Sequence, residues 1–408
     1  MISLQPDILA TAVGIVSSIG QGKTAVTDAL LAGHSAFRVM SRPGRQGATT
    51  AYLGAEMPAL MLPGNVSKQT IRAASLPSLA ALTVLHEAWE EARLDQMEPS
   101  RIGLIVGGSN VQQRESSLMR DAYQGREAFL RPSYALSFMD TDLCGFCTSH
   151  FDIRGLAFTV GGASASGQLA IAQAAQAIRM GQVDVCIALG ALMDLSHWEC
   201  QGFRAIGAMG SDRFAGEPQL ACRPFDREHD GFIYGELCAS IVLESAASAL
   251  HRRTKPYARL LGCSVRMDGN RNPDPSYEGE VYAIRDALDR SGLSAEQIDY
   301  INPHGTGSMI GDQTELEALR TCALSGAYLN TTKSLLGHGL SAAGTVEAAV
   351  TLLQMRAGRL HPSKNLDTPV DPSMNWVRDA SVEHQIRNAL TLGFGFGGIN
   401  TALCWQHC

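Results

Sequence analysis

The sequence predicts an α/β protein with two packed halves, built on a largely parallel β-sheet that helices cover on both faces. Three observations support this prediction. Short apolar runs alternate with Ala- and Leu-rich helical patterns along the chain. At 408 residues the chain exceeds the usual size of one hydrophobic core. Its 45% hydrophobic and 18% charged residues, with 41 glycines, are typical of a well-packed α/β protein rather than a disordered or fibrous one.

The first half shows the clearest alternation of strands and helices. Buried strands are expected over residues 8–13, 102–106 and 185–189, because these short runs are almost wholly apolar. Helices are expected between 18 and 33, where a glycine ends the pattern, and over 76–92. Strands that alternate with helices in this way favour a parallel sheet.

The polar and basic segment 245–255 is the predicted junction between the halves. After it the alternation restarts, with a strand over 258–263 and a helix over 278–291. The chain is therefore divided into an N-terminal half, residues 1–250, and a C-terminal half, residues 251–408.

Charge and hydropathy exclude two classes of partner. The formal net charge of −7, without long runs of one sign, argues against nucleic acid, whose phosphates need a basic surface. No stretch of 18 or more apolar residues occurs, so no membrane span is expected. Residues 1–7 hold no basic segment followed by an apolar run. The sequence therefore predicts a cytoplasmic protein.

The ten cysteines favour free buried thiols over disulfides or metal. The single C-x-x-C, Cys144 to Cys147, has no second pair to complete a zinc tetrahedron. No metal site is predicted.

Ser164 lies in a turn of small residues, Gly161 to Gly167, between a short β run at 156–160 and an amphipathic helix at 168–180. A tight strand-to-helix turn exposes a side chain and aims helix N–H groups at it. The alternative is that the small residues only let strand and helix pack closely. An α/β-hydrolase elbow needs glycine where Ser166 stands, which weakens that interpretation.

Three further segments combine a turn or strand end with polar or aromatic residues. They are Asn302-Pro-His304-Gly-Thr306-Gly, Thr332-Lys333-Ser-Leu-Leu-Gly337-His338 and Gly393-Phe394-Gly-Phe396-Gly-Gly398-Ile-Asn400. Alone, His304 would more often be a structural histidine and Lys333 a solvated base. The G-x-G-x-x-G pattern at 393–398 leaves too few residues for a dinucleotide fold.

In this order and spacing the motifs resemble the β-ketoacyl synthases, the condensing enzymes of fatty-acid and polyketide assembly. Residues 10–20, 223–236, 311–315 and 344–347 extend the resemblance along the whole chain. It implies a thiolase-like α/β fold, with two similar halves in a five-layered αβαβα arrangement, and a homodimer with active sites near its interface.

The resemblance also assigns roles to individual residues. Ser164 replaces the nucleophilic cysteine, and His304 and His338 match the two active-site histidines. Lys333 matches the structural or electrostatic lysine. The supporting positions are Glu347, the buried acid beside that lysine, and the aromatic gate of Phe394 and Phe396, where the backbone N–H of Phe396 joins that of Ser164 in an oxyanion hole.

Serine changes the chemistry that this site can perform. A thiol with a pKa of about 8.5 readily becomes a thiolate, whereas a hydroxyl is far too weak an acid and would form a less reactive oxyester. Decarboxylation of a malonyl group needs hydrogen-bond donors for an enolate, which His304 and His338 supply. The predicted function is therefore decarboxylation of malonyl-acyl carrier protein to acetyl-acyl carrier protein, as in the serine variants of polyketide β-branching cassettes.

Two other functions are also compatible with the sequence. One is a condensing enzyme that uses Ser164 as an oxygen nucleophile with a histidine as general base. The other is a non-catalytic partner resembling a chain-length factor, although such partners tend to lose the histidines that this chain keeps.

The resemblance also implies the partners. The substrate would arrive on the phosphopantetheine of an acidic acyl carrier protein, so no bound cofactor is expected, and a companion synthase resembling HMG-CoA synthase would use the acetyl product. An acidic carrier needs a basic patch near the cavity mouth. Lys68, Arg72 and Arg204 are the candidates, with solvated surface charges as the alternative.

Overall fold

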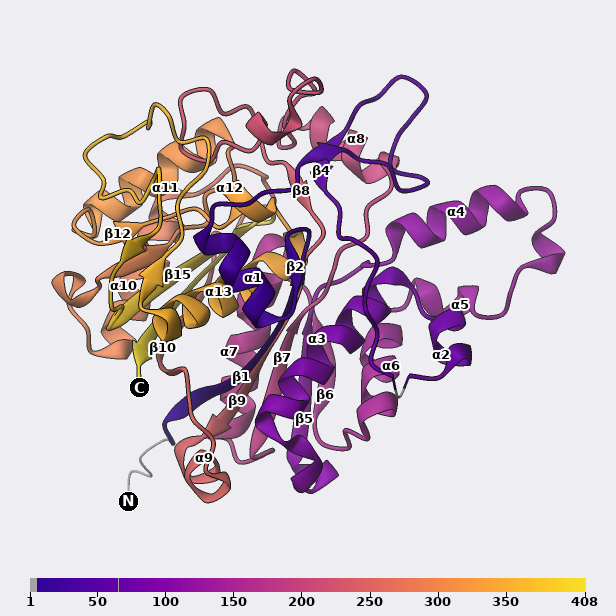
Figure 1. The fold of residues 1–408 in the computed structure, drawn as a ribbon, viewed down its shortest axis with the longest axis horizontal. Coiled ribbons are helices and arrows are strands. Elements are labelled where there is room, and N and C mark those ends of the chain that lie inside the picture. The colour runs from indigo at the N-terminus through magenta and orange to yellow at the C-terminus, as the bar shows by residue number, and fades with distance from the viewer. Residues whose placement is uncertain (1–5, 65) are drawn as a thin grey trace.

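The strands of both halves join into one large sheet in the computed structural model, which describes residues 6–64 and 66–408 (Figure 1). Along the chain they are β1 (Ile8–Ser17), β2 (Gly20–Gln21), β5 (Ile102–Gly107), β6 (Ala157–Val160), β7 (Val185–Gly190), β9 (Cys238–Ser245), β10 (Ala258–Met267), β11 (Tyr300–Asn302), β12 (Tyr328–Leu329), β15 (Asn388–Gly395) and β16 (Ile399–His407). The strand order is β12-β11-β15-β16-β10-β1-β9-β7-β5-β6, with β2 paired to β1. The halves therefore meet where β1 pairs with β10.

Helices form three layers around the two halves of this sheet. The outer layer of the N-terminal half is α3 (Leu76–Ala92) with α6 (Thr141–Phe151), and that of the C-terminal half is α10 (Tyr277–Ser291) with α11 (Met309–Thr321). Between the half-sheets lie α7 (Ser166–Arg179) and α13 (Ala343–Ala357), which pack against each other (Figure 1). This arrangement gives the five layers of the thiolase-like fold, as predicted.

The remaining elements lie at the surface or connect the layers. The helices are α1 (Lys23–Leu31), α2 (Lys68–Ala73), α4 (Gln113–Tyr123), α5 (Tyr134–Ser137), α8 (His197–Ala205), α9 (Ala246–Arg252) and α12 (Lys333–Leu336). The short strands are β3 (Arg38–Val39), β4 (Leu53–Ala55), β8 (Tyr234–Gly235), β13 (Arg359–Leu360) and β14 (Val382–Glu383).

The prediction of a largely parallel sheet was wrong, because the sheet is mixed. The pairs β5–β6, β5–β7, β11–β12 and β11–β15 are parallel, whereas β9 runs antiparallel to both β1 and β7, and β16 runs antiparallel to both β10 and β15. Strands buried on both faces appear as continuous apolar runs whichever way their neighbours run, so the sequence pattern does not reveal the direction.

The predicted junction, residues 245–255, contains the short helix α9. Ser245 caps α9 by accepting a hydrogen bond from the backbone N–H of Ser248, and β10 starts six residues after the end of α9. The division at residue 250 falls inside α9 and stays a prediction.

Two close contacts bring α7 and α13 together. The hydroxyl of Thr345 donates to the carbonyl of Gly167 over 3.0 Å, and a Cβ at position 167 would lie 2.4 Å from the backbone nitrogen of Thr345. Only glycine allows this approach. It fixes the start of α7, and therefore the turn before it, against the C-terminal half.

Candidate active site

The turn that carries Ser164 is held by its own side chains. It follows β6 as a 3₁₀ turn, Ala163–Ala165, in which Ala163 has a left-handed φ of 46°. The hydroxyl of Ser166 accepts from the N–H of Gly162 at 2.9 Å and donates to the carbonyl of Ala163 at 2.7 Å. A non-glycine residue with this φ stores strain that the surroundings must offset. The turn therefore presents Ser164 in a fixed position at the start of α7.

His338 lies opposite Ser164 and contacts it directly. Its Nε2 is 2.9 Å from the Ser164 hydroxyl oxygen. The backbone N–H of Leu340 donates to Nδ1 of His338 at 3.4 Å. Burial and the charge of Lys333 hold the pKa of His338 well below its usual range. The neutral ring therefore has its acceptor at Nδ1 and its hydrogen at Nε2, where it donates toward Ser164 and the cavity.

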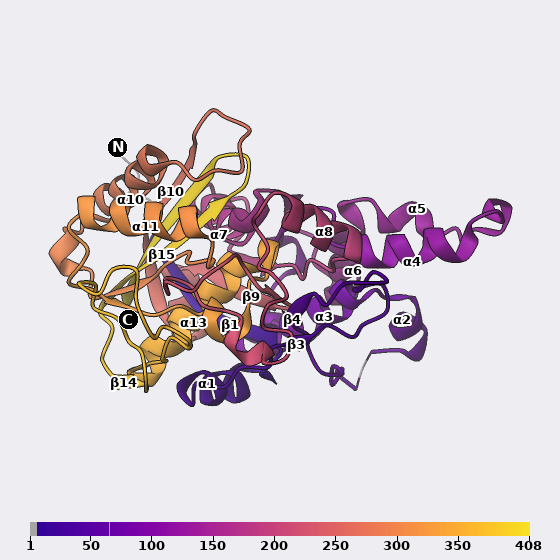
Figure 2. The same cartoon turned by 90° about the horizontal axis from the view of Figure 1, so that it is seen from above.

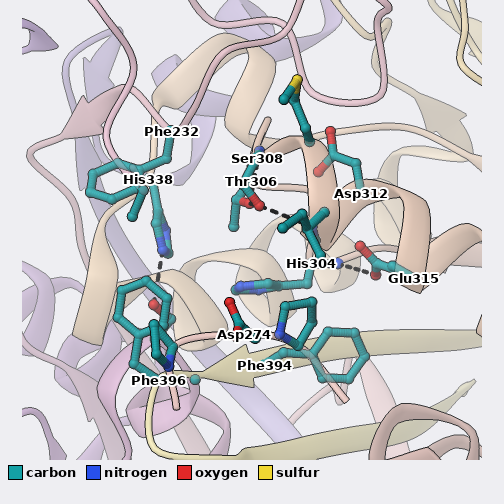
Figure 3. A pocket seen from close by; sticks show the side chains of 18 of the residues that line it. Phe232, Asp274, His304, Thr306, Ser308, Asp312, Glu315, His338, Phe394 and Phe396 are labelled. Atoms are coloured by element: carbon teal, nitrogen blue, oxygen red, sulfur yellow. Dashed lines mark hydrogen bonds between the residues drawn. The ribbon is translucent and has the colours of Figure 1, made fainter. Parts of the chain in front are cut away.

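His304 is held from behind by a carboxylate and points toward the same space. The backbone N–H groups of His304 and Gly305 donate to the two oxygens of Glu315 at 2.6 and 2.8 Å. The rings of His304 and His338 have centroids 5.6 Å apart at an interplanar angle of 84° (Figure 3). Both imidazoles thus approach one site from different elements.

Lys333 and Glu347 form a buried ion pair beneath His304. The Lys333 ammonium contacts Glu347 Oε1 and the carbonyl oxygen of His304, and its Nζ lies 3.5 Å from Nδ1 of His304. An ammonium has only hydrogens to offer, so Nδ1 of His304 is the acceptor and Nε2 carries the ring hydrogen. Burial, then the charges of Lys333 and His338, lower the pKa of His304 far below its usual range. Burial raises the pKa of Glu347 to about 7 despite the ion pair.

Ser164, His304 and His338 line one cavity of about 320 Å³, together with both predicted gate residues. The rings of Phe394 and His304 have centroids 5.6 Å apart, and Phe396, 39% exposed, lies with its ring 6.3 Å from that of Phe203. Figure 3 shows Phe396 below His338 and Phe394 beside His304. The structure therefore brings Ser164, His304, His338, Phe394 and Phe396 to one cavity, with Lys333 and Glu347 behind it. The oxyanion-hole role of Ser164 and Phe396 stays a prediction.

The three candidate docking residues are separated in the structure. Lys68 and Arg72 are exposed on α2, which lies beside the N-terminal half and well apart from α10 and α11 in both views (Figures 1 and 2). Arg204 stands two residues before Ile206, which lines the cavity, and its guanidinium lies 4.6 Å from the ring centre of Tyr52. Only Arg204 is near the cavity mouth.

Glu280 also lines the cavity, although it lies in none of the sequence motifs. It is 1% exposed on α10, and within the described residues its Oε2 has no hydrogen-bond partner. Burial and the neighbouring carboxylates of Glu315, Asp268 and Asp312 raise its pKa well above the usual range. Its spacing was a signal, because position 280 shares a helical face with the apolar residues 283, 284 and 287.

Glu315 and Asp312 are the acids of the 311–315 motif, and no role was predicted for either. Asp312 accepts from the backbone N–H of Phe225 at 2.6 Å and of Gly307 at 3.0 Å, and lies 2.7 Å from Nδ1 of His229. The two acids therefore hold the loop that carries His304.

The described part of the chain shows no cluster of three or more His, Cys, Asp or Glu side chains arranged to bind a metal ion. Cys144 and Cys147 are free and buried in α6, where burial raises the pKa of both thiols. None of the described helices has the length and apolarity needed to cross a membrane. The N-terminal residues 1–5, part of the segment on which the cytoplasmic prediction depends, lie outside the described residues.

The strand-turn-helix serine, the paired histidines and the five-layered fold define a ketosynthase-type condensing-enzyme site. Family models agree: the β-ketoacyl synthase N-terminal domain matches residues 5–249 and the C-terminal domain matches residues 257–367. The chain belongs to the β-ketoacyl synthase family.

The chain is similar to particular members of this family along nearly its whole length. The chain is 58% identical over 402 residues, covering 98% of it and 97% of the relative, to the polyketide biosynthesis malonyl-ACP decarboxylase PksF of Bacillus subtilis. It is 30% identical to 3-oxoacyl-[acyl-carrier-protein] synthase 1 of Haemophilus influenzae, over 97% of this chain and 98% of that one. Among solved structures, a β-ketoacyl synthase from Burkholderia phymatum superposes with a TM-score of 0.91 at 27% identity, covering 99% of this chain and all of that one.

Proposed function

We propose that this protein removes carbon dioxide from malonyl-acyl carrier protein and leaves acetyl-acyl carrier protein. The observation that carries the proposal is the hydrogen-bond arrangement at Ser164, where a donor nitrogen of His338 faces the hydroxyl 2.9 Å away. The long and close similarity to a malonyl-ACP decarboxylase supports the same reaction.

The arrangement suits decarboxylation because both histidines are neutral donors. When the malonyl carboxylate leaves as carbon dioxide, negative charge develops on the thioester oxygen. The Nε2–H groups of His304 and His338 are placed to donate to that oxygen, and the Lys333–Glu347 pair keeps His304 in the donating tautomer. One well-placed donor of this kind is worth on the order of a hundred- to a thousandfold in rate.

The same arrangement does not suit a serine nucleophile. A general base for Ser164 needs a free lone pair on the nitrogen that faces the hydroxyl, and a carboxylate to orient the ring. Nε2 of His338 carries the hydrogen instead, and its Nδ1 accepts from the backbone N–H of Leu340 rather than facing a carboxylate. Condensation through Ser164 therefore lacks its activating base.

Mass spectrometry of malonyl-carrier protein, incubated with and without the protein, tests the proposal. We expect conversion to acetyl-carrier protein only when the protein is present. A second incubation with acyl-carrier protein and malonyl-carrier protein tests the condensing alternative. A β-ketoacyl product together with an acyl ester on the protein would overturn the decarboxylase proposal.

The acyl carrier protein is the proposed partner, and a homodimer is the proposed assembly. The segment from α4 to α5 projects from the body (Figures 1 and 2) and carries exposed apolar side chains, among them Phe129 at 77% exposure and Phe138 at 57%. β6 is the last strand of the sheet, so its outer edge is available to pair with a second copy. Light scattering measures the mass in solution, and a monomer would contradict the homodimer.

The proposed setting is a β-branching step of polyketide assembly in the cytoplasm. There the acetyl product would be used by a companion enzyme resembling HMG-CoA synthase. Adding such a synthase and a β-ketoacyl-carrier protein to the assay tests this setting, since the acetyl group should then appear in the branched product.

A further inference from the structure

Loss of carbon dioxide turns C2 of the malonyl group into an enolate carbon, which becomes a methyl group only after it gains a proton. His304 and His338 stabilise the oxygen end of this enolate and leave its carbon end without an acid. We propose that the hydroxyl group of Ser164 protonates C2. The inference rests on the proposed function, because only a decarboxylase that releases acetyl needs this proton.

The hydrogen of the Ser164 hydroxyl is available for this step. In the contact with His338 the ring nitrogen donates and the serine oxygen accepts, so the bond leaves the serine's own hydrogen unused. Among the described residues, His338 is the hydrogen-bond partner that the structure gives to this oxygen. Ser164 is 7% exposed and lines the cavity, so its hydrogen can be directed to a ligand there.

The geometry also places C2 within reach of this hydroxyl. The single Nε2–H of His338 is shared between the thioester oxygen of the bound substrate and the serine oxygen, which lies 2.9 Å from Nε2. In an acyl group the second carbon is roughly 2.4 Å from the carbonyl oxygen, given standard C=O and C–C bond lengths. A group that bonds to Nε2 of His338 through its oxygen therefore has its C2 next to Ser164 when it lies with C2 toward α7.

Water is the only further reactant that the step needs, because it replaces the proton that Ser164 gives to C2. The bond from C2 to the carboxylate breaks, its electron pair forms the enolate, and carbon dioxide leaves. The enolate carbon then takes the hydrogen of Ser164, and the electron pair of the O–H bond stays on the serine oxygen. As this oxygen gains charge it takes a proton from solvent water, which leaves hydroxide, so Ser164 stays a hydroxyl group and no alkoxide accumulates.

Protonation of C2 by Ser164 would explain why position 164 is a serine and not an alanine. Alanine at position 164 would also remove the thiol chemistry, yet the chain has a serine whose oxygen is hydrogen-bonded to His338 and whose side chain lines the cavity. A fixed donor on one side of C2 delivers its hydrogen to one face of the enolate, whereas water that enters the cavity reaches either face. The stereochemistry of the product methyl group therefore reports the acid.

The experiment uses malonyl-carrier protein in which one C2 hydrogen is stereospecifically replaced by tritium, turned over by the protein in deuterium oxide. The acetyl methyl group then contains hydrogen, deuterium and tritium, and its configuration is analysed. We expect a single configuration from the wild-type protein. We expect a mixture from Ser164→Ala and from Ser164→Gly, and a single configuration from Ser164→Thr, which keeps the hydroxyl.

Each other outcome has a distinct meaning. A wild-type product of mixed configuration, or a single unchanged configuration from Ser164→Ala or Ser164→Gly, overturns the role of Ser164 while the decarboxylase proposal stands. If the wild-type protein releases no carbon dioxide from malonyl-carrier protein, the proposed function itself fails. Two truncations are used because Ser164→Gly retains the test if Ser164→Ala does not fold.

Discussion

The two halves of the molecule hold the residues that they contribute to the cavity in different ways. The N-terminal half contributes Ser164 from a turn of glycine, alanine and serine, held by hydrogen bonds between neutral groups. The C-terminal half contributes His304 and His338, with the Lys333–Glu347 ion pair buried behind them. Both halves use a strand, a turn and a helix. The buried Lys333–Glu347 pair lies directly behind the histidines, whereas the buried ions Arg45, Asp194 and Glu236 of the N-terminal half do not line the cavity.

The difference shows which chemical task each half supports. Buried charges are costly unless they are paired, so they are expected where they fix the tautomer or position of a working group. In the C-terminal half they hold His304 as a neutral donor. The N-terminal half places its hydroxyl without any charge that would favour ionisation. This arrangement supports the proposed stabilisation of an enolate over the formation of an oxygen nucleophile at Ser164.

The largest expected effect comes from breaking the ion pair of the C-terminal half. Lys333→Ala leaves the carboxyl group of Glu347 buried without its partner, and the free energy of unfolding should fall by about 3–5 kcal/mol. Denaturant titration at neutral pH measures this loss. The double variant Lys333→Met, Glu347→Leu should lose less, because it buries no unpaired charge. Equal losses in the single and double variants would show that the charge is not the cause.

The next largest effect is a difference in the rate of carbon dioxide release between variants of the two halves. His304→Ala or His338→Ala should slow release of carbon dioxide about a hundredfold or more, because each removes a donor to the enolate oxygen. Ser164→Ala should lose less than about tenfold, since that donor pair remains. Assays of carbon dioxide release with malonyl-carrier protein measure all three. Equal, large losses in the three variants would show that release of carbon dioxide requires the Ser164 hydroxyl, and an acyl ester on the protein would then identify it as a nucleophile.

The buried carboxyl group of Glu280 should make the stability of the protein depend on pH. Its pKa is raised in the folded protein, mainly by burial, so the folded state binds the proton more tightly than the unfolded state. Its contribution to stability is therefore complete below the unfolded pKa of about 4.3 and is lost as pH rises toward the folded pKa. Glu280→Gln cannot ionise and should become more stable than wild type by about 1–3 kcal/mol as pH rises above that value.

Denaturant titrations of Glu280→Gln at a series of pH values measure this difference. The matched control is Glu278→Gln, because Glu278 is exposed in the first turn of the same helix. Its stability should stay within about 0.5 kcal/mol of wild type at every pH. A flat difference between Glu280→Gln and wild type would mean that Glu280 ionises normally in the folded protein.

The sequence predicted the parts of the site that stand in local motifs. Ser164 and His304 each lie in a short turn with its own pattern, and Lys333 starts α12 in the motif that also carries His338. The helices over 76–92 and 278–291 follow from apolar spacing. Strand direction was not predictable, because β9 and β16 are apolar along most of their length whether their neighbours are parallel or antiparallel.

Contacts that depend on the folded backbone could not be predicted from the sequence for a different reason. The orientation of His338 depends on a backbone N–H two residues later, and the position of His304 depends on a carboxylate eleven residues later. Lys68, Arg72 and Arg204 looked equivalent as isolated basic residues, yet only Arg204 lies near the cavity. Such distinctions arise only after the chain has folded.

The smallest expected effect concerns the carrier protein at the mouth of the cavity. Arg204 lies two residues before the cavity-lining Ile206 and also pairs with Asp212 at 3.5 Å, so part of its charge is already used. Arg204→Ala should raise the KM for malonyl-carrier protein only a few-fold, as expected for a charge at the rim of an interface. Lys68→Ala and Arg72→Ala should change this KM less, because α2 lies apart from the helices that border the cavity.

A small malonyl thioester without a carrier is the control substrate, and its KM should not change. If the small thioester is affected as strongly as the carrier substrate, Arg204 acts by holding the cavity wall; if Lys68→Ala has the larger effect, the carrier docks on the N-terminal half.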